Sequence, residues 1–303
     1  MDQNTVDKIK QLKKEKGVVI LAHYYVDGEV QQLADYVGDS YYLAKAATKV
    51  KEKSILFCGV SFMGESAKIL NPGKKVVMAD PYADCPMAHM VTPERIAEVR
   101  AEHDDVAVVC YVNSTAEIKA VSDVCVTSSN AVKVTGRLDA KNIFFVPDNN
   151  LGRFVAEKLP EKNFIFHDGF CHVHKSVSAD NVAEAKKLRP NALVLTHPEC
   201  TMEVVQMSDF VGSTSEIIAY ATNSDKEEFI ICTEMGVYFE LMQKNPNKKF
   251  YSVGHRQFCP NMKKVTLDKV LSALQTMEHE VTLPRDVMEK ALVPLQKMLE
   301  LAE

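Results

Sequence analysis

Three copies of one pattern run through this chain, and this repeat constrains the fold more than any other feature. Each copy opens with an apolar run of strand length that ends in a polar residue, namely His23, Asn113 or His197. A second apolar run and a helical stretch follow, and every copy closes with a cysteine. A repeat at this period fixes the architecture before any single motif is interpreted.

Alternation of short apolar runs with helical patterns predicts βαβ units with parallel strands and right-handed crossovers. We therefore expect an α/β protein of three similar three-layer αβα sandwich domains with parallel sheets, related by pseudo-threefold symmetry. The predicted domains span 1–86, 87–172 and 173–260, and a helical extension over 261–303 is expected to pack on the first repeat. Helix-capping residues are predicted at Thr92, Ser178 and Thr266.

The cysteines Cys85, Cys171 and Cys259 occupy the same place in the three copies. Ligands of open α/β sheets bind at the carboxyl ends of the strands, so these thiols are expected to meet at one centre. Three thiolates that converge repel one another unless a metal neutralises them. The remaining cysteines in or beside apolar runs are expected to be plain core residues: Cys58, Cys110, Cys125 and Cys232.

Two kinds of metal site fit these thiols. Structural zinc could take the three cysteines and His174 as a fourth ligand. An iron-sulfur cluster held by three cysteines would leave one iron without a protein ligand, free to act as a Lewis acid on a substrate oxygen. The wide spacing of the cysteines and the lack of a C-x₂-C pair favour the cluster.

Charge and hydropathy exclude several classes of partner. A net charge of -5 without a long basic run argues against nucleic acid. No stretch approaches the roughly 20 apolar residues of a membrane span, and the amino-terminal segment is too polar for a signal peptide. We therefore expect a cytoplasmic protein without a membrane partner, whose eight cysteines stay reduced.

Small polar turns follow the first strand of each copy: Gly38-Asp39-Ser40, Thr127-Ser128-Ser129 and Gly212-Ser213-Thr214. Their hydroxyls and the amides of a helix start suit carboxylate or phosphate groups. Together with His23 and His197 at equivalent strand ends, they predict a pocket for an anionic substrate with several carboxylates.

The motifs LAHYY, GDS, ADCPM, YVNST, TSSNAV, GFCHVH, HPEC, GSTS and CPNMKK, in this order, resemble those of the quinolinate synthase family. The resemblance runs from about residue 18 to about residue 271. It implies a three-domain α/β transferase with a central 4Fe-4S cluster. It also implies condensation of iminoaspartate with dihydroxyacetone phosphate to quinolinate, with loss of phosphate and water, in de novo NAD biosynthesis.

The resemblance implies a role for individual residues. One 4Fe-4S cluster per chain would be held by Cys85, Cys171 and Cys259, with one iron left open. The substrate-binding set would be His23, Ser40, Tyr111, Asn113, Ser128, His197, Glu199, Ser213 and Thr214. Proton handling would fall to Tyr25, His23, His174 and Glu199. The partners would be the small anionic substrates iminoaspartate and dihydroxyacetone phosphate, with functional coupling to an aspartate-oxidising enzyme.

Two departures from the family pattern are visible. Phe170 and His172 flank Cys171, where the family often has Gly-His-Cys-Pro. The third cysteine is followed by Pro-Asn-Met instead of a C-x₂-C-x₂-C run, which predicts that no disulfide regulates this chain. A hydro-lyase with an open-iron cluster and a structural zinc protein remain the alternative functions.

Overall fold

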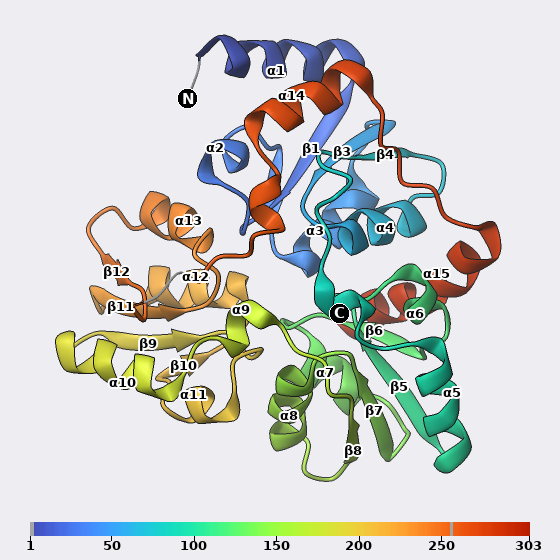
Figure 1. Ribbon diagram of the computed structural model, residues 1–303, viewed down its shortest axis with the longest axis vertical. Coiled ribbons are helices and arrows are strands. Elements are labelled where there is room, and N and C mark those ends of the chain that lie inside the picture. Colours follow the sequence, from blue (N-terminus) through green and yellow to red (C-terminus); the bar gives the residue numbers. More distant parts are fainter. Residues whose placement is uncertain (1–2, 255–256) are drawn as a thin grey trace.

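The computed structural model describes residues 3–254 and 257–303 and confirms the predicted α/β architecture. Three four-stranded sheets are all parallel and share one strand order, with the first strand of each repeat between the second and the third. They form three lobes around a common centre, blue, green and yellow to orange in Figure 1. The domain boundaries given above stay a prediction.

The first repeat surrounds the sheet β2-β1-β3-β4. Its strands are β1 (Val18–His23), β2 (Tyr36–Gly38), β3 (Ser54–Cys58) and β4 (Lys75–Met78). Its helices are α1 (Gln3–Lys16), α2 (Gly28–Gln31), α3 (Ser40–Lys49), α4 (Ser61–Leu70) and the 3₁₀ helix η1 (Pro86–His89). Every residue of β1 is buried, as expected for a central strand covered on both faces.

The second repeat surrounds the sheet β6-β5-β7-β8. Its strands are β5 (Val106–Tyr111), β6 (Val124–Val126), β7 (Asn142–Val146) and β8 (Asn163–Phe166). Its helices are α5 (Pro93–Glu102), α6 (Ala116–Ala120), α7 (Ala131–Gly136) and α8 (Asn149–Lys158). The predicted cap of α5 is confirmed, because the Thr92 hydroxyl accepts the backbone N–H of Arg95.

The third repeat surrounds the sheet β10-β9-β11-β12. Its strands are β9 (Leu193–Thr196), β10 (Phe210–Val211), β11 (Glu228–Cys232) and β12 (Lys249–Tyr251). Its helices are α9 (His172–Lys175), α10 (Ala179–Leu188), α11 (Met202–Gln206), α12 (Thr214–Asn223), α13 (Val237–Lys244) and the 3₁₀ helix η2 (Met262–Lys264). Ser178 caps α10 as predicted, in a reciprocal capping box with Asn181.

The carboxyl-terminal helices divide between two repeats. Helix α14 (Leu267–Thr276), capped by Thr266 as predicted, lies against α1 of the first repeat. Helix α15 (Arg285–Leu301) instead packs mainly on α6 and β6 of the second repeat and also touches α4. The expectation that the whole extension packs on the first repeat is therefore wrong for α15. Its buried residues Ala291, Leu295 and Met298 belong to the apolar core that the first two repeats share.

A carboxylate joins the first two strands of each repeat at the same place. Asp35, Asp123 and Asp209 each stand just before the second strand and accept a backbone N–H from the first strand, at 2.8, 2.7 and 2.7 Å. These three aspartates lie away from the carboxyl ends of the strands that carry the cysteines. Their equivalence shows that the repeat extends to individual hydrogen bonds.

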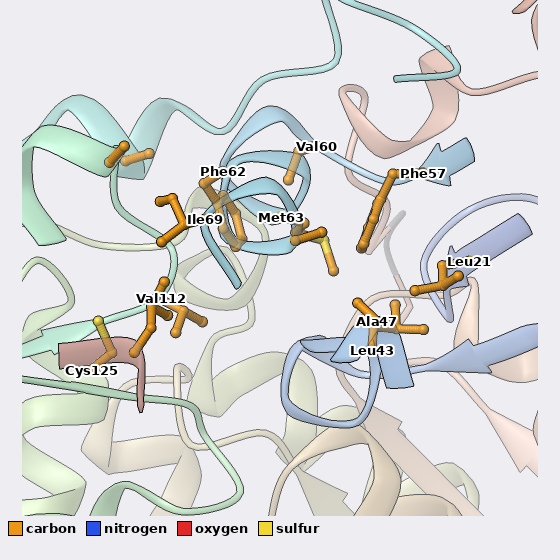
Figure 2. Packing of buried hydrophobic residues seen from close by; sticks show 14 of the residues in the cluster. Leu21, Leu43, Ala47, Phe57, Val60, Phe62, Met63, Ile69, Val112 and Cys125 are labelled. Carbon is orange, nitrogen blue, oxygen red and sulfur yellow. The ribbon is translucent and has the colours of Figure 1, made fainter. Parts of the chain in front are cut away.

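The first and second repeats share one apolar core, whereas smaller apolar clusters fill the third. Figure 2 shows the α4 side chains Phe62, Met63 and Ile69 within the shared core, with side chains of both repeats around them. The cysteines expected to be core residues are fully buried: Cys58, Cys110, Cys125 and Cys232. None of the helices in the described part of the chain is long and apolar enough to cross a membrane.

Candidate active site

One cavity lies where the carboxyl ends of the strands of all three repeats meet. Nearly all predicted site residues line it: His23, Tyr25, Ser40, Cys85, Tyr111, Asn113, Ser128, Cys171, His174, His197, Glu199, Thr214 and Cys259. Ser213 is the exception among them. Its buried hydroxyl caps α12 by accepting the backbone N–H of Glu216, so it does not face the cavity.

The cysteines Cys85, Cys171 and Cys259 are free thiols on the cavity wall. Burial raises the pKa of Cys85 to about 12. Burial, Glu199 and Cys85 hold the pKa of Cys171 well above its ordinary value. Because a bound cation favours the thiolate form, a metal would resolve this unfavourable grouping of three thiols.

A second set of donors lies beside Cys171. The ligand atoms of Cys171, His174 and Glu199 lie within 4.8 Å of one another. His174 Nδ1 is 3.2 Å from Cys171 Sγ and 2.5 Å from Glu199 Oε2, and its Nε2 is 2.8 Å from the hydroxyl of Thr233. The cavity thus combines thiol, imidazole and carboxylate donors, a chemistry that fits a metal cofactor.

The histidines at the ends of β1 and β9 have matching environments. His23 Nδ1 accepts the backbone N–H of Tyr25 at 3.1 Å, and His197 Nδ1 accepts that of Glu199 at 3.3 Å. An Nδ1 that accepts carries no proton, so each neutral ring keeps its proton on Nε2. Burial lowers the pKa of both histidines to about 3. They are therefore neutral hydrogen-bond donors at physiological pH.

Tyr25 presents a protonated phenol to the cavity. Its hydroxyl lies 2.7 Å from Thr214 Oγ1 and 2.9 Å from Thr233 Oγ1. Burial, and then the charge of Glu199, hold its pKa well above the ordinary value. Its ring meets the His23 ring edge to face at 4.5 Å. Packing and hydrogen bonds together fix this side chain, so it can donate a proton from a defined position.

Glu199 is ionised, in contrast to the neutral phenol of Tyr25. Burial alone would raise its pKa, but the close contact with His174 brings it below the ordinary value, so the carboxylate stays ionised. Its second oxygen, Oε1, and Asn113 Oδ1 are buried without a hydrogen-bond partner among the described residues. Buried polar atoms of folded proteins are rarely left unpaired. These two atoms therefore mark places where a bound ligand could donate hydrogen bonds.

Other residues of the site carried weaker sequence signals. The cavity wall also contains Asp39, Thr127 and Glu234, which stand in the polar turns or at a strand end. Lys263 belongs to the CPNMKK motif, but no role was predicted for it. Its Nζ donates to the backbone oxygen of Tyr25 at 2.8 Å and lies 3.5 Å from Glu234 Oε1, so it joins the first repeat to the third.

Comparison with known proteins agrees with this geometry. A family model described as "Quinolinate synthetase A protein" (NadA) matches residues 7–300. The chain belongs to this family. The family resemblance drawn from the motifs is thereby confirmed.

Curated relatives match along nearly their whole length. A protein of Fusobacterium nucleatum named quinolinate synthase is 55% identical over 296 residues, which cover 98% of this chain and 99% of that protein. One of Clostridioides difficile with the same name is 51% identical over 303 residues and all of both chains. One of Caldicellulosiruptor bescii is 50% identical over 295 residues, 97% of each.

Proposed function

We propose that this chain is a quinolinate synthase, a transferase that condenses iminoaspartate with dihydroxyacetone phosphate and releases phosphate and water, in de novo NAD biosynthesis. Membership of the NadA family and the names of its relatives support this function. The observation that carries the proposal is the cavity itself. It gathers three thiols, two neutral histidines and an ionised glutamate from three separate repeats.

We propose that Cys85, Cys171 and Cys259 hold one 4Fe-4S cluster per chain. When bound, the cluster would supply an iron without a protein ligand, able to act as a Lewis acid. The hydrogen bonds of His174 support ligation by cysteines alone, because Nδ1 meets Glu199 and Nε2 meets Thr233. A zinc site that used His174 would have to break one of these contacts.

The dicarboxylate substrate would be held by donors from all three repeats. We assign this role to His23 and His197 through Nε2–H, to Asn113 and Tyr111 of the second repeat, and to the hydroxyls of Ser40, Ser128 and Thr214. Ser213 is left out because its hydroxyl already caps α12. Neutral imidazole donors suit carboxylates here, since they add no charge that must be desolvated.

A chain of hydrogen bonds connects the proposed proton donor to the proposed acceptor. From the Tyr25 hydroxyl it passes to Thr233 Oγ1 at 2.9 Å, to His174 Nε2 at 2.8 Å, and from His174 Nδ1 to Glu199 Oε2 at 2.5 Å. Tyr25 can thus give a proton to the substrate and be reprotonated through this chain. His23, which touches the Tyr25 ring, would orient the phenol.

The supply of iminoaspartate follows from its chemistry. An imine of this kind hydrolyses in water, so we propose functional coupling to an aspartate-oxidising enzyme in the cytoplasm. Its reaction would produce the first substrate where this chain can capture it.

Product analysis tests the proposed reaction. Chain purified without oxygen should convert iminoaspartate, generated in the assay, and dihydroxyacetone phosphate into quinolinate and phosphate. Dehydration of a small hydroxy acid without formation of a pyridine ring would instead support the hydro-lyase alternative. Metal analysis of the same preparation tests the cofactor: iron without sulfide, or zinc, would refute the proposed 4Fe-4S cluster.

A further inference from the structure

Each of the three cysteines donates its backbone N–H to a carboxylate. Cys85 N is 2.8 Å from Asp84 Oδ1, Cys171 N is 3.2 Å from Asp148 Oδ2, and Cys259 N is 2.9 Å from Glu234 Oε1. The same bond therefore occurs once in each repeat. Asp148 and Glu234 are completely buried.

Each carboxylate also accepts a second hydrogen bond. Its donor lies in the segment that follows the third strand of the repeat, where the next helix begins. Asp148 Oδ1 accepts Leu151 N of α8 at 2.8 Å, and Glu234 Oε2 accepts Gly236 N before α13 at 2.5 Å. In the first repeat, Asp84 accepts from the Ser61 hydroxyl at the start of α4. Each carboxylate thus joins its cysteine segment to a helix start.

Backbone hydrogen bonds support the same junctions. One residue of each junction, Ser61, Asn149 or Met235, donates its N–H to the carbonyl two residues before the cysteine, at 2.8, 2.8 and 2.7 Å. Asp148 and Glu234 occupy the position just before this donor, whereas the first repeat has Val60 there. Its carboxylate comes from Asp84, next to Cys85. The interaction is retained although its residue has changed place in the sequence.

We propose that Asp84, Asp148 and Glu234 are positioning residues for the three metal ligands. This inference rests on the proposed cofactor. The carboxylates hold the cysteine segments against the rigid sheet and helix of each repeat, so the sulfur atoms are arranged before the cluster is inserted. Partners that orient metal ligands typically change metal affinity about 10- to 100-fold when they are removed.

Substitution by amides separates this role from general stability. Asp148→Asn and Glu234→Gln each leave one acceptor oxygen for the two backbone N–H groups that the carboxylate now accepts. The new side-chain NH₂ group faces the second of these donors. Both substitutions should therefore disturb the position of the cysteine that the carboxylate holds, Cys171 or Cys259. Asp84 accepts both of its hydrogen bonds, from Cys85 N and from the Ser61 hydroxyl, through Oδ1 alone. Asp84→Asn should therefore keep these two hydrogen bonds, whereas Asp84→Ala should lose them.

The matched control is Asp123→Asn. Asp123 is another carboxylate that accepts a strand N–H in the second repeat, from Val108 at 2.7 Å, but among the residues described it makes no hydrogen bond to the segments of the three proposed metal ligands. All variants would be reconstituted without oxygen using ferrous iron and sulfide. Iron per chain and the rate of iron release to a chelator would be measured, with circular dichroism to verify folding.

We expect Asp148→Asn, Glu234→Gln and Asp84→Ala to release iron at least about tenfold faster than the wild type, and Asp84→Asn and Asp123→Asn to match it. Equal release from folded variants at all these positions would overturn the positioning role alone, as would equal acceleration in Asp123→Asn. A wild-type chain that takes up no iron and sulfide would overturn the proposed cofactor together with this inference.

Discussion

His23 and His197 should make the protein sensitive to acid below pH 6.5. Both rings are at most 5% exposed, and both use Nδ1 to accept a backbone N–H, so protonation at Nδ1 would break a hydrogen bond inside the cavity. Burial lowers their pKa from 6.5 to about 3. At pH 5 the unfolded chain has protonated these side chains and the folded chain has not.

The magnitude follows from the difference in proton binding. Since each pKa unit corresponds to about 1.4 kcal/mol, each histidine should reduce the free energy of unfolding by about 2 kcal/mol between pH 7 and pH 5. The direction is fixed because the folded-state pKa is lowered. The loss begins as the pH falls below 6.5 and levels off near pH 3.

Urea unfolding of the cluster-free chain at pH 7 and pH 5 measures this loss. His23→Asn and His197→Asn are suitable variants, because Asn113 stands at the equivalent strand end in the second repeat. Each should lose about 2 kcal/mol less than the wild type on going from pH 7 to pH 5. Parallel losses in wild type and variants would refute the neutral, buried state of the histidines, as would ¹⁵N shifts of imidazolium at pH 5.5.

Three further outcomes are expected. Tyr25→Phe should leave iron content and the absorption spectrum intact but lower turnover by roughly 10²- to 10⁴-fold, and unchanged turnover would remove Tyr25 from the mechanism. Lys263→Met should lower the free energy of unfolding by about 2 kcal/mol in urea titrations, because the buried Glu234 carboxylate loses its cation and the Tyr25 carbonyl loses its donor. An unchanged midpoint would show that this contact does not join the repeats. Mild disulfide reductants should not alter activity, since Pro-Asn-Met follows Cys259; a clear activation would contradict this.

The fold was predictable because its signal is repeated. Three equivalent apolar runs, each ending in a polar residue, indicate β1, β5 and β9 independently, and strand ends of parallel sheets meet at one edge. The position of α15 could not be predicted in this way. An amphipathic helix shows that it has an apolar face, but tertiary packing decides which surface that face covers.

The lining of the cavity was predictable where residues stand at strand ends or in the repeated turns. Ser213 does not line the cavity, and the Ser-x-x-Glu spacing to Glu216 is itself the signature of the capping box that the structure shows. Asp148 and Lys263 were missed for a different reason. Asp148 contacts Cys171, and Lys263 contacts Tyr25 in a distant part of the chain. The local sequence around each residue does not indicate these contacts.

The most direct test of the central claim is metal analysis of chain purified without oxygen. Iron, acid-labile sulfide and zinc would be measured together with the absorption spectrum for the wild type, for Cys171→Ser, and for Cys58→Ser as a control at a buried core thiol. We predict about four irons and four sulfides per chain in the wild type and the control, and their loss in Cys171→Ser. One zinc without sulfide would contradict the account.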